Sequence, residues 1–360
     1  MANKTARLGD LATYINGYAF KPADWGDTGL PIIRIQDLTG NSYQLNRYDG
    51  DYPERIEVND GDVLISWSAS LGVYVWQRGK ALLNQHIFKV VFDKLPVNKE
   101  YFVFAVEHKL AEMESKTHGA TMKHIVKKDF DGTTIPYPPI EKQAEIADHL
   151  RRITSLIDRQ TEQLLLLDQL VKSRFIELFG DYDLTHPQES WVTIKEIGTV
   201  VGGATPKTDH DEYWGGSYRW ITPAELDGDS GYIYDSVRKL TKAGVESCSL
   251  QEMPVGTVIL SSRAPIGKVA IAGNTFYCNQ GFKNIICKEG ITPRYLYTVL
   301  LLNVEYLNSL GRGATFKEIS KGIVESIRIP VPSMELQQQF AAFVEQTDKS
   351  KLCGKMEVAA

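Results

Sequence analysis

Residues 140–179 read IEKQAEIADHLRRITSLIDRQTEQLLLLDQLVKSRFIELF and contain neither proline nor glycine. The proline-rich segment Ile135-Pro-Tyr-Pro-Pro139 precedes them and Gly180 follows them, so the sequence predicts one uninterrupted helix from Ile140 to Phe179. Such a helix is roughly 60 Å long. The alternative is a helix buried in one large domain, and typical helix lengths disfavour it.

One face of this helix carries large apolar side chains at alternating steps of four and three residues, which is the heptad spacing of a coiled coil. Gln160 and Arg174 fill the two polar gaps in that pattern. We call the apolar positions the seam, and we expect them to contact a partner: Ile146, Leu150, Ile153, Ile157, Leu164, Leu167, Val171 and Leu178. The helix is therefore interpreted as a spacer between two globular parts that needs a helical partner along its seam.

The sequence on either side of the spacer repeats one plan. Residues 119–150 and 313–344 align without a gap and share twelve identities in 32 positions. The matching motifs are Gly61-Asp-Val-Leu-Ile-Ser66 with Gly256-Thr-Val-Ile-Leu-Ser261, Asn84-Gln85 with Asn279-Gln280, Gly119-Ala-Thr-Met-Lys-His-Ile125 with Gly313-Ala-Thr-Phe-Lys-Glu-Ile319, and Ile135-Pro-Tyr-Pro138 with Ile329-Pro-Val-Pro332. The chain therefore contains a duplicated unit.

Each copy begins with β-branched and aromatic segments separated by Gly, Asn and Asp, and then continues into a helical segment. The sequence predicts a mixed α/β (α+β) fold with two similar mixed-sheet domains. Their predicted bounds are 1–139 and 182–333, with the spacer helix over 140–181 and a second, shorter helix with a tail over 334–360.

Composition excludes several classes of protein. The chain has 360 residues, a net charge of −5, and no apolar run long enough for a signal peptide or a membrane helix. Its four cysteines form no CxxC pair, which favours a reduced, cytoplasmic setting. No GxGxxG, GxxxxGK[ST], GxSxG or HxxxH pattern occurs. We therefore predict no catalytic residues, no bound cofactor, no metal and no membrane association.

The duplicated motifs around one heptad helix resemble the specificity subunit of type I restriction–modification systems, over nearly the whole chain. The resemblance implies that each globule is a target-recognition domain that reads one half of a bipartite, interrupted DNA site. It also implies that the helices bind methyltransferase subunits, which methylate adenine with S-adenosylmethionine, and that restriction subunits join them. The cofactor would belong to the methyltransferase subunit, and this chain would be a non-catalytic DNA-recognition subunit.

Two other functions stay open. A coiled-coil adaptor that binds only proteins would not need the duplicated basic segments described next. A self-contained methyltransferase would need a cofactor-binding domain whose motifs this sequence lacks.

Basic side chains surround the Gly-Ala-Thr turn in both copies. Cations at a glycine turn suit phosphate contacts, which anchor a protein on duplex DNA without reading its sequence. A solvated basic face is the alternative. The candidate phosphate-binding residues are Lys116, Lys123, His124, Lys127 and Lys128 in the first copy and Arg312, Lys317 and Lys321 in the second.

The paired amides Asn84-Gln85 and Asn279-Gln280 are also DNA-binding candidates, because amide side chains pair with adenine edges. Both copies keep them although two domains should read different sequences, which favours an architectural or backbone-directed role. Base reading belongs instead to loops that differ between the copies. The candidates there are Arg47, Trp67, Arg78, Arg263 and Lys268.

The second helix is expected to run from Met334 to about Lys351, and we interpret it as truncated relative to the family. It would cover about five of the nine turns of the seam. We therefore expect Leu164, Leu167, Val171 and Leu178 to lack a partner within the chain. A methyltransferase subunit, or a second copy of the chain when it is alone, would bury them.

Overall fold

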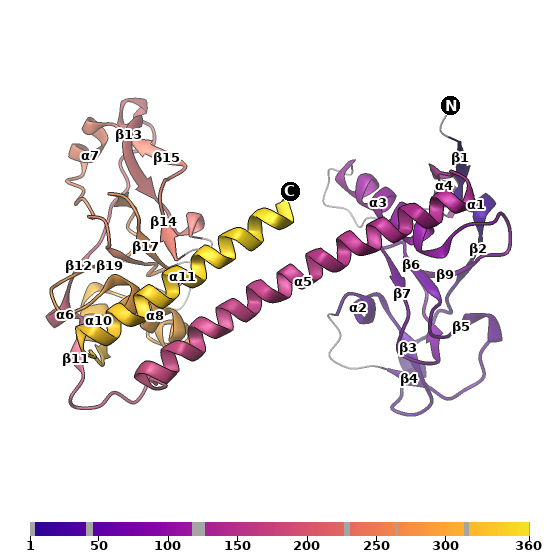
Figure 1. Cartoon of the computed structure of the whole chain (residues 1–360), viewed down its shortest axis with the longest axis horizontal. Coiled ribbons are helices and arrows are strands. Elements are labelled where there is room, and N and C mark those ends of the chain that lie inside the picture. Colours follow the sequence, from indigo (N-terminus) through magenta and orange to yellow (C-terminus); the bar gives the residue numbers. More distant parts are fainter. Residues whose placement is uncertain are drawn as a thin grey trace. The chain divides into compact units, whose positions relative to one another are not determined.

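A computed structural model describes residues 4–40, 46–116, 127–226, 231–263, 265–312 and 317–359 (Figure 1). The chain divides into two compact units, Met1–Asp158 and Arg159–Ala360, and the boundary lies inside the long helix. Each unit contains β-sheets and helices, so the predicted mixed α+β fold is confirmed. None of the described helices combines the length and the apolar composition that a membrane crossing needs.

The first unit holds two four-stranded sheets in its described part. The antiparallel sheet has the order β2-β9-β6-β7, with β2 at Thr13–Asn16, β9 at Ile87–Val91, β6 at Val63–Ser66 and β7 at Gly72–Val75. The second has the order β4-β3-β8-β5, with β4 at Arg47–Tyr48, β3 at Leu30–Ile33, β8 at Ala81–Leu83 and β5 at Glu57–Val58.

A short pair and several helices complete this unit. The pair joins β1 (Thr5–Arg7) to β10 (Thr134–Pro136), so β1 lies beside the strand that leads into the spacer helix. The helices are α1 (Leu8–Leu11), α2 (Ile35–Leu38), α3 (Lys99–Lys116) and α4 (Lys127–Gly132), with 3₁₀ turns at Pro22–Asp24 and Glu54–Ile56.

Strand β6 reads Val-Leu-Ile without polar alternation because each of its faces packs against a different apolar cluster. Val63 and Ile65 belong to a cluster that includes Phe102 of α3. Leu64, which points to the other face, belongs to a cluster with Ile32 of the second sheet. Both faces of this strand are therefore core, and all of its residues are buried.

The second unit repeats this arrangement with one strand more in its larger sheet and one strand fewer in the other. Its larger sheet has the order β12-β19-β16-β17-β14, with β12 at Gly198–Val201, β19 at Asn284–Cys287, β16 at Val258–Leu260, β17 at Val269–Ala272 and β14 at Tyr232–Ile233. Strand β14 pairs with β17 in parallel. As in the first unit, the central strand β16 divides its side chains: Val258 and Leu260 join one cluster, and Ile259 joins another.

The remaining strands of the second unit form a three-stranded sheet and a pair. The sheet has the order β15-β13-β18, with β15 at Arg238–Leu240, β13 at Trp214–Ile221 and β18 at Tyr277–Cys278, and the pair joins β11 (Val192–Thr193) to β20 (Arg328–Ile329). The helices are α6 (Ile194–Ile197), α7 (Lys242–Ser247), α8 (Pro293–Leu302), α9 (Val304–Ser309) and α10 (Lys321–Ser326), with 3₁₀ turns at Asp211–Tyr213 and Pro223–Glu225.

In the first unit, a tyrosine and a glutamine fix the start of the spacer helix to its domain. The hydroxyl of Tyr101 donates to the carbonyl of Pro136 at 2.8 Å. The buried Gln143 accepts from the backbone N–H of Asn98 at 2.9 Å and donates to the carbonyl of Pro138 at 2.8 Å. We call this arrangement the helix joint.

The second unit contains the same helix joint. Tyr295 donates to the carbonyl of Pro330 at 2.9 Å. The buried Gln337 accepts from the N–H of Thr292 at 2.8 Å and donates to the carbonyl of Pro332 at 2.9 Å. The duplication seen in the sequence is thus a duplication of individual hydrogen bonds.

The spacer helix α5 spans Ile140–Phe179, which confirms the predicted bounds. The last helix, α11, spans Met334–Ala359 and extends past its predicted end near Lys351. Within the second unit the two helices are antiparallel neighbours (Figure 1). The ring of Phe340, near the start of α11, lies 5.6 Å from that of Phe179, and Lys351 near its end forms an ion pair with Asp168.

The seam in the second unit is covered by the chain itself. Val171 and Leu178 pack against the main apolar cluster of that unit, and Leu164 and Leu167 are half-buried in a groove beside α11. The prediction that these side chains lack a partner within the chain was therefore wrong. The reason is that α11 is longer than expected and that the domain core also reaches α5.

Other apolar side chains of α5 are exposed instead. In the second unit these are Leu165, Leu166 and Leu170, with exposed fractions of 60%, 54% and 48%. In the first unit, Ile146 and Leu150 of the seam are half-buried, whereas Ile153 and Ile157 are exposed.

Candidate nucleic-acid interface

Three short segments of the second domain place charged side chains in a row. Glu318 forms an antiparallel bridge with Arg312 on one side and with Arg263 on the other. Its backbone exchanges hydrogen bonds of 3.0 and 3.1 Å with that of Arg312. Because residues directly opposite one another across an antiparallel bridge project from the same face, Arg263, Glu318 and Arg312 lie side by side.

Two cations contact the carboxylate of Glu318. Nη1 of Arg263 lies 3.6 Å from Oε2, and Nζ of Lys283 lies 3.1 Å from Oε1. Lys283 also donates to Oγ of the buried Ser262 at 3.3 Å, and its side chain is only 15% exposed, whereas those of Arg263 and Glu318 are 37% and 39% exposed. We call these four residues, Arg263, Lys283, Arg312 and Glu318, the Glu318 cluster. Within it, the side chains of Arg263 and Glu318 are exposed enough to contact a ligand.

The other predicted phosphate-binding residues of the second copy flank this cluster. Lys317 precedes Glu318 directly and is exposed. Lys321 is the first residue of α10, and its ammonium group lies 3.7 Å from the carboxylate of Glu325 in the same helix. The Gly-Ala-Thr-Phe turn itself, residues 313–316, lies outside the described residues.

The amides of the second copy hold local backbone geometry. Oδ1 of Asn279 accepts from the N–H of Gly281 at 2.9 Å, and Oε1 of Gln280 accepts from the hydroxyl of Thr205 at 2.6 Å. Lys268 donates to the carbonyl of Pro223 at 3.0 Å. These contacts favour an architectural role for all three side chains over base reading.

The first domain presents aromatic rings at the aligned place. Trp67, which aligns with Ser262, stacks on Phe88 at a centroid distance of 5.5 Å and meets His86 edge-on at 5.0 Å. Phe88 aligns with Lys283, counted from the shared Asn-Gln. Asn84 accepts from the N–H of Gln85 at 2.9 Å, so this amide also stabilises its own turn.

The remaining basic candidates of the first domain are spread over several elements. Lys127 and Lys128 open α4 and are exposed, and Lys127 pairs with Asp131 at 3.0 Å. Nη1 of Arg47 donates to the carbonyl of Gly29 at 2.8 Å, and Nη1 of Arg78 donates to that of Asp37 at 3.1 Å. Lys123, His124 and the side chain of Lys116 lie outside the described residues.

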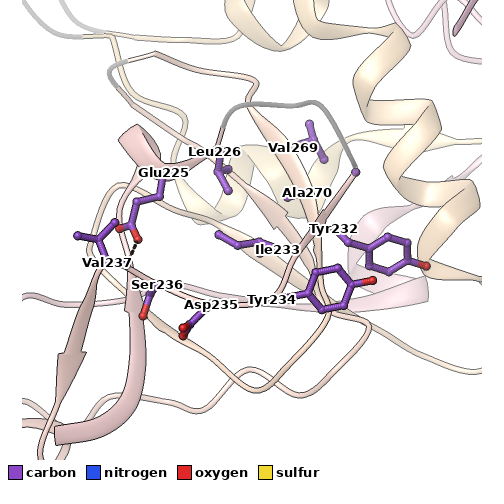
Figure 2. Close-up of a pocket in the computed structure, with 11 residues that line it drawn as sticks. Glu225, Leu226, Tyr232, Ile233, Tyr234, Asp235, Ser236, Val237, Val269 and Ala270 are labelled. Atoms are coloured by element: carbon purple, nitrogen blue, oxygen red, sulfur yellow. Dashed lines mark hydrogen bonds between the residues drawn. The ribbon is translucent and has the colours of Figure 1, made fainter. Parts of the chain in front are cut away.

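A pocket of about 430 Å³ in the second domain is lined by β14, by the residues that follow it up to Val237, and by the start of β17 (Figure 2). One carboxylate oxygen of Glu225 is held there by the N–H of Val237 at 2.7 Å. The hydrogen bond from Lys239 holds the pKa of Asp235 below its usual value, so this carboxylate stays ionised. Two carboxylates in the wall repel phosphate. Nor does any group of three or more His, Cys, Asp and Glu side chains suited to a metal ion occur among the described residues.

Comparison with known proteins identifies the family to which this chain belongs. The model of a family described as "Type I restriction modification DNA specificity domain" matches residues 2–167 and, a second time, residues 189–354. The chain belongs to this family. Each match spans one domain and the first part of the helix that follows it, so the family unit coincides with the duplication.

Relatives in this family support the assignment over different lengths. The MjaIX specificity subunit of Methanocaldococcus jannaschii is 43% identical over half of this chain, and the match spans 43% of its own length. The MjaVIII specificity subunit of the same organism is 23% identical over 96% of this chain and 86% of its own. The crystal structure of the type I restriction–modification S subunit from M. genitalium shares the fold, with a TM-score of 0.59 at 15% identity over 99% of this chain and 92% of that one.

Two members of the Glu318 cluster were not singled out from the sequence. Glu318 stands inside the Gly-Ala-Thr-x-Lys-x-Ile motif that this chain repeats, but its importance depends on Arg263 and Lys283, which lie far from it in the sequence. Lys283 follows the Asn-Gln pair by three residues. An acid inside a basic motif is the signal by which Glu318 could have been found.

Proposed function

We propose that this chain is a DNA-recognition subunit whose two domains each read one half of a bipartite, interrupted site. It directs methyltransferase and restriction subunits to that site for adenine methylation or restriction, and it acts in the cytoplasm. The chain itself is non-catalytic, and S-adenosylmethionine binds to the methyltransferase subunit.

The observation that carries this proposal is a contrast between kept and changed residues. Both copies keep the helix joint, in which a tyrosine and a glutamine at equivalent positions make equivalent hydrogen bonds. At the aligned place one copy has the half-buried Trp67 over the buried Phe88, and the other has the partly exposed Glu318 cluster. A shared scaffold with different side chains at one place is what two domains that bind different sequences require.

The exposed leucines of α5 supply a place for the methyltransferase subunit. A groove of about 680 Å³ lies between α5 and α11 in the second unit and is lined by Leu166 and Leu170. Burying a large apolar side chain contributes roughly 1.5–3 kcal/mol, so these residues favour a protein partner. When methyltransferase subunits are missing, a second copy of the chain would cover the same leucines.

A domain exchange tests the function. Residues 1–139 are replaced by the same region of a relative, and methylated adenines are mapped in cells that also contain the methyltransferase subunit. We expect the sequence of one half of the methylated site to change and that of the other half to stay the same. The reciprocal exchange of residues 182–333 is the matched control and changes the opposite half. If either exchange altered both halves, independent reading by the two domains would be excluded.

A further inference from the structure

We propose that Arg263 and Glu318 together read one C·G base pair in the half-site bound by the second domain. Glu318 accepts a hydrogen bond from N4 of cytosine, and Arg263 donates to O6 and N7 of guanine in the major groove. The inference rests on the proposed function and deepens it, because it assigns a base pair to a pair of side chains.

The first argument concerns charge. Arg312 and Lys317, which are exposed beside Glu318, suit phosphate groups. A carboxylate among them repels any phosphate that approaches and so weakens backbone binding. Glu318 therefore does not fit a surface that binds only phosphates. It fits a surface that meets an amino group, and among base edges a carboxylate pairs with N4 of cytosine.

The second argument concerns distance. In a C·G pair, N4 of cytosine and O6 of guanine are hydrogen-bonded to each other at about 3 Å. Two side chains that read these atoms must have their polar tips equally close. Nη1 of Arg263 and Oε2 of Glu318 are 3.6 Å apart, and both side chains are more than a third exposed.

The third argument concerns orientation. Lys283 holds Oε1 of Glu318 at 3.1 Å and is itself fixed by the buried Ser262. A carboxylate oxygen accepts more than one hydrogen bond, so Oε2 retains capacity for a base amino group beside Arg263. Lys283 is in this way a positioning residue, which aims the carboxylate without touching DNA.

The first domain lacks both members of the pair. His124 stands at the position of Glu318 in the repeated motif, and Ser68 aligns with Arg263. Residues that read the second half-site are expected to be absent from the first domain, since the two halves of the site differ.

The test is a change of base preference in the full chain assembled with its methyltransferase subunit. Methylation is measured on a library of sites in which each position of the second half-site is randomised. The wild-type chain prefers C·G at one position. In Glu318→Gln, which keeps the size of the side chain, this preference decreases by a factor of about 5 to about 100. The base preferences in the first half-site do not change. Arg263→Gln weakens the preference for C·G at the same position of the second half-site.

The matched control is Glu325→Gln, which removes the same charge from a carboxylate paired with Lys321 in the same domain. It leaves every base preference as in the wild type. The inference is overturned if Glu318→Gln strengthens binding to all sequences equally, since Glu318 would then only neutralise cations. Arg263→Gln decides the matter if thermal melting shows that Glu318→Gln is misfolded. A wild-type chain without any preference in the second half-site would instead contradict the proposed function.

Discussion

The two domains are alike where each meets its helix and differ at the aligned place that holds Trp67 in the first domain and Ser262 in the second. At the helix joint, Gln143 and Gln337 are buried and make equivalent hydrogen bonds. At the aligned place, the first domain has the half-buried Trp67 stacked on the buried Phe88, whereas the second has charged side chains around Glu318. Duplication has kept the contacts that hold a domain on its helix and has changed the side chains at this place.

The largest effect is expected at the helix joint. Gln337→Leu removes three hydrogen bonds of a buried side chain, one from the N–H of Thr292 and two to the carbonyls of Pro332 and Gly290, and each costs roughly 0.5–1.5 kcal/mol. We expect the free energy of unfolding to fall by about 3 kcal/mol, measured by urea unfolding. Gln143→Leu should cost a similar amount in the first unit. Gln338→Leu, at the exposed neighbouring position, is the control and should change stability little. A cost for either buried glutamine no larger than that of the control would show that its hydrogen bonds do not hold the domain on its helix.

A smaller effect is expected at the surface of the first domain. Trp67→Ala removes the stack on Phe88 and the contact with His86, and we expect a loss of about 2 kcal/mol in stability because the ring is only half-buried. Ser262→Ala, at the aligned position of the second domain, removes one hydrogen bond to Lys283 and should cost about 1 kcal/mol or less. Thermal melting of both variants measures the difference. Equal losses would contradict the view that this place is aromatic core in one copy and polar surface in the other.

DNA affinity should respond more modestly to a residue that both copies keep. Lys317, whose counterpart is Lys123, is exposed, and Lys317→Ala should weaken duplex binding by about 10-fold for all sequences alike. The slope of log affinity against log salt should fall by about 0.9. Titration of duplexes at several salt concentrations measures both quantities. A shift in the preferred sequence at unchanged salt slope would move Lys317 from phosphate contact to base reading.

The smallest effect concerns the thiols of the second unit. Burial raises the pKa values of Cys278 and Cys287 to about 12, above their ordinary value, so both stay protonated at pH 8. Cys353 is exposed. A thiol reagent should therefore label the exposed Cys353 before the partly exposed Cys287 in the folded chain and reach the buried Cys278 only after unfolding, as mass spectrometry would record. Rapid labelling of Cys278 at pH 8 would disprove the packing of β18 against the core.

The sequence predicted the spacer helix and the duplication because both are local or periodic signals. The bounds of α5 follow from prolines before it and a glycine after it, and the duplication follows from motifs at a fixed offset. The hydrogen bonds of the helix joints were seen only in the structure. The Glu318 cluster could not be predicted in the same way. Lys283 lies 35 residues before Glu318, and only the folded sheet brings the two together.

The seam shows a different limit of prediction from the sequence. A heptad pattern identifies the side chains that face a partner, but not which partner. Leu164 to Leu167 are four consecutive leucines, and successive residues of a helix point about 100° apart, so one neighbour cannot cover all four. Leu164, Leu166 and Leu167 line the groove beside α11, whereas Leu165 lies outside that lining and is 60% exposed. The four consecutive leucines therefore indicate a second contact surface on this helix, which the heptad spacing alone does not reveal.

The central strands β6 and β16 have a consequence for the way each domain opens. Each strand contributes side chains to two apolar clusters at once, so neither cluster can separate from the other while the strand stays paired. Backbone amides of Val63–Ser66 and Val258–Leu260 are then released to solvent only when their whole domain unfolds, and they should be the slowest to exchange hydrogen for deuterium. Each domain behaves as one cooperative unit because a single strand belongs to both of its cores.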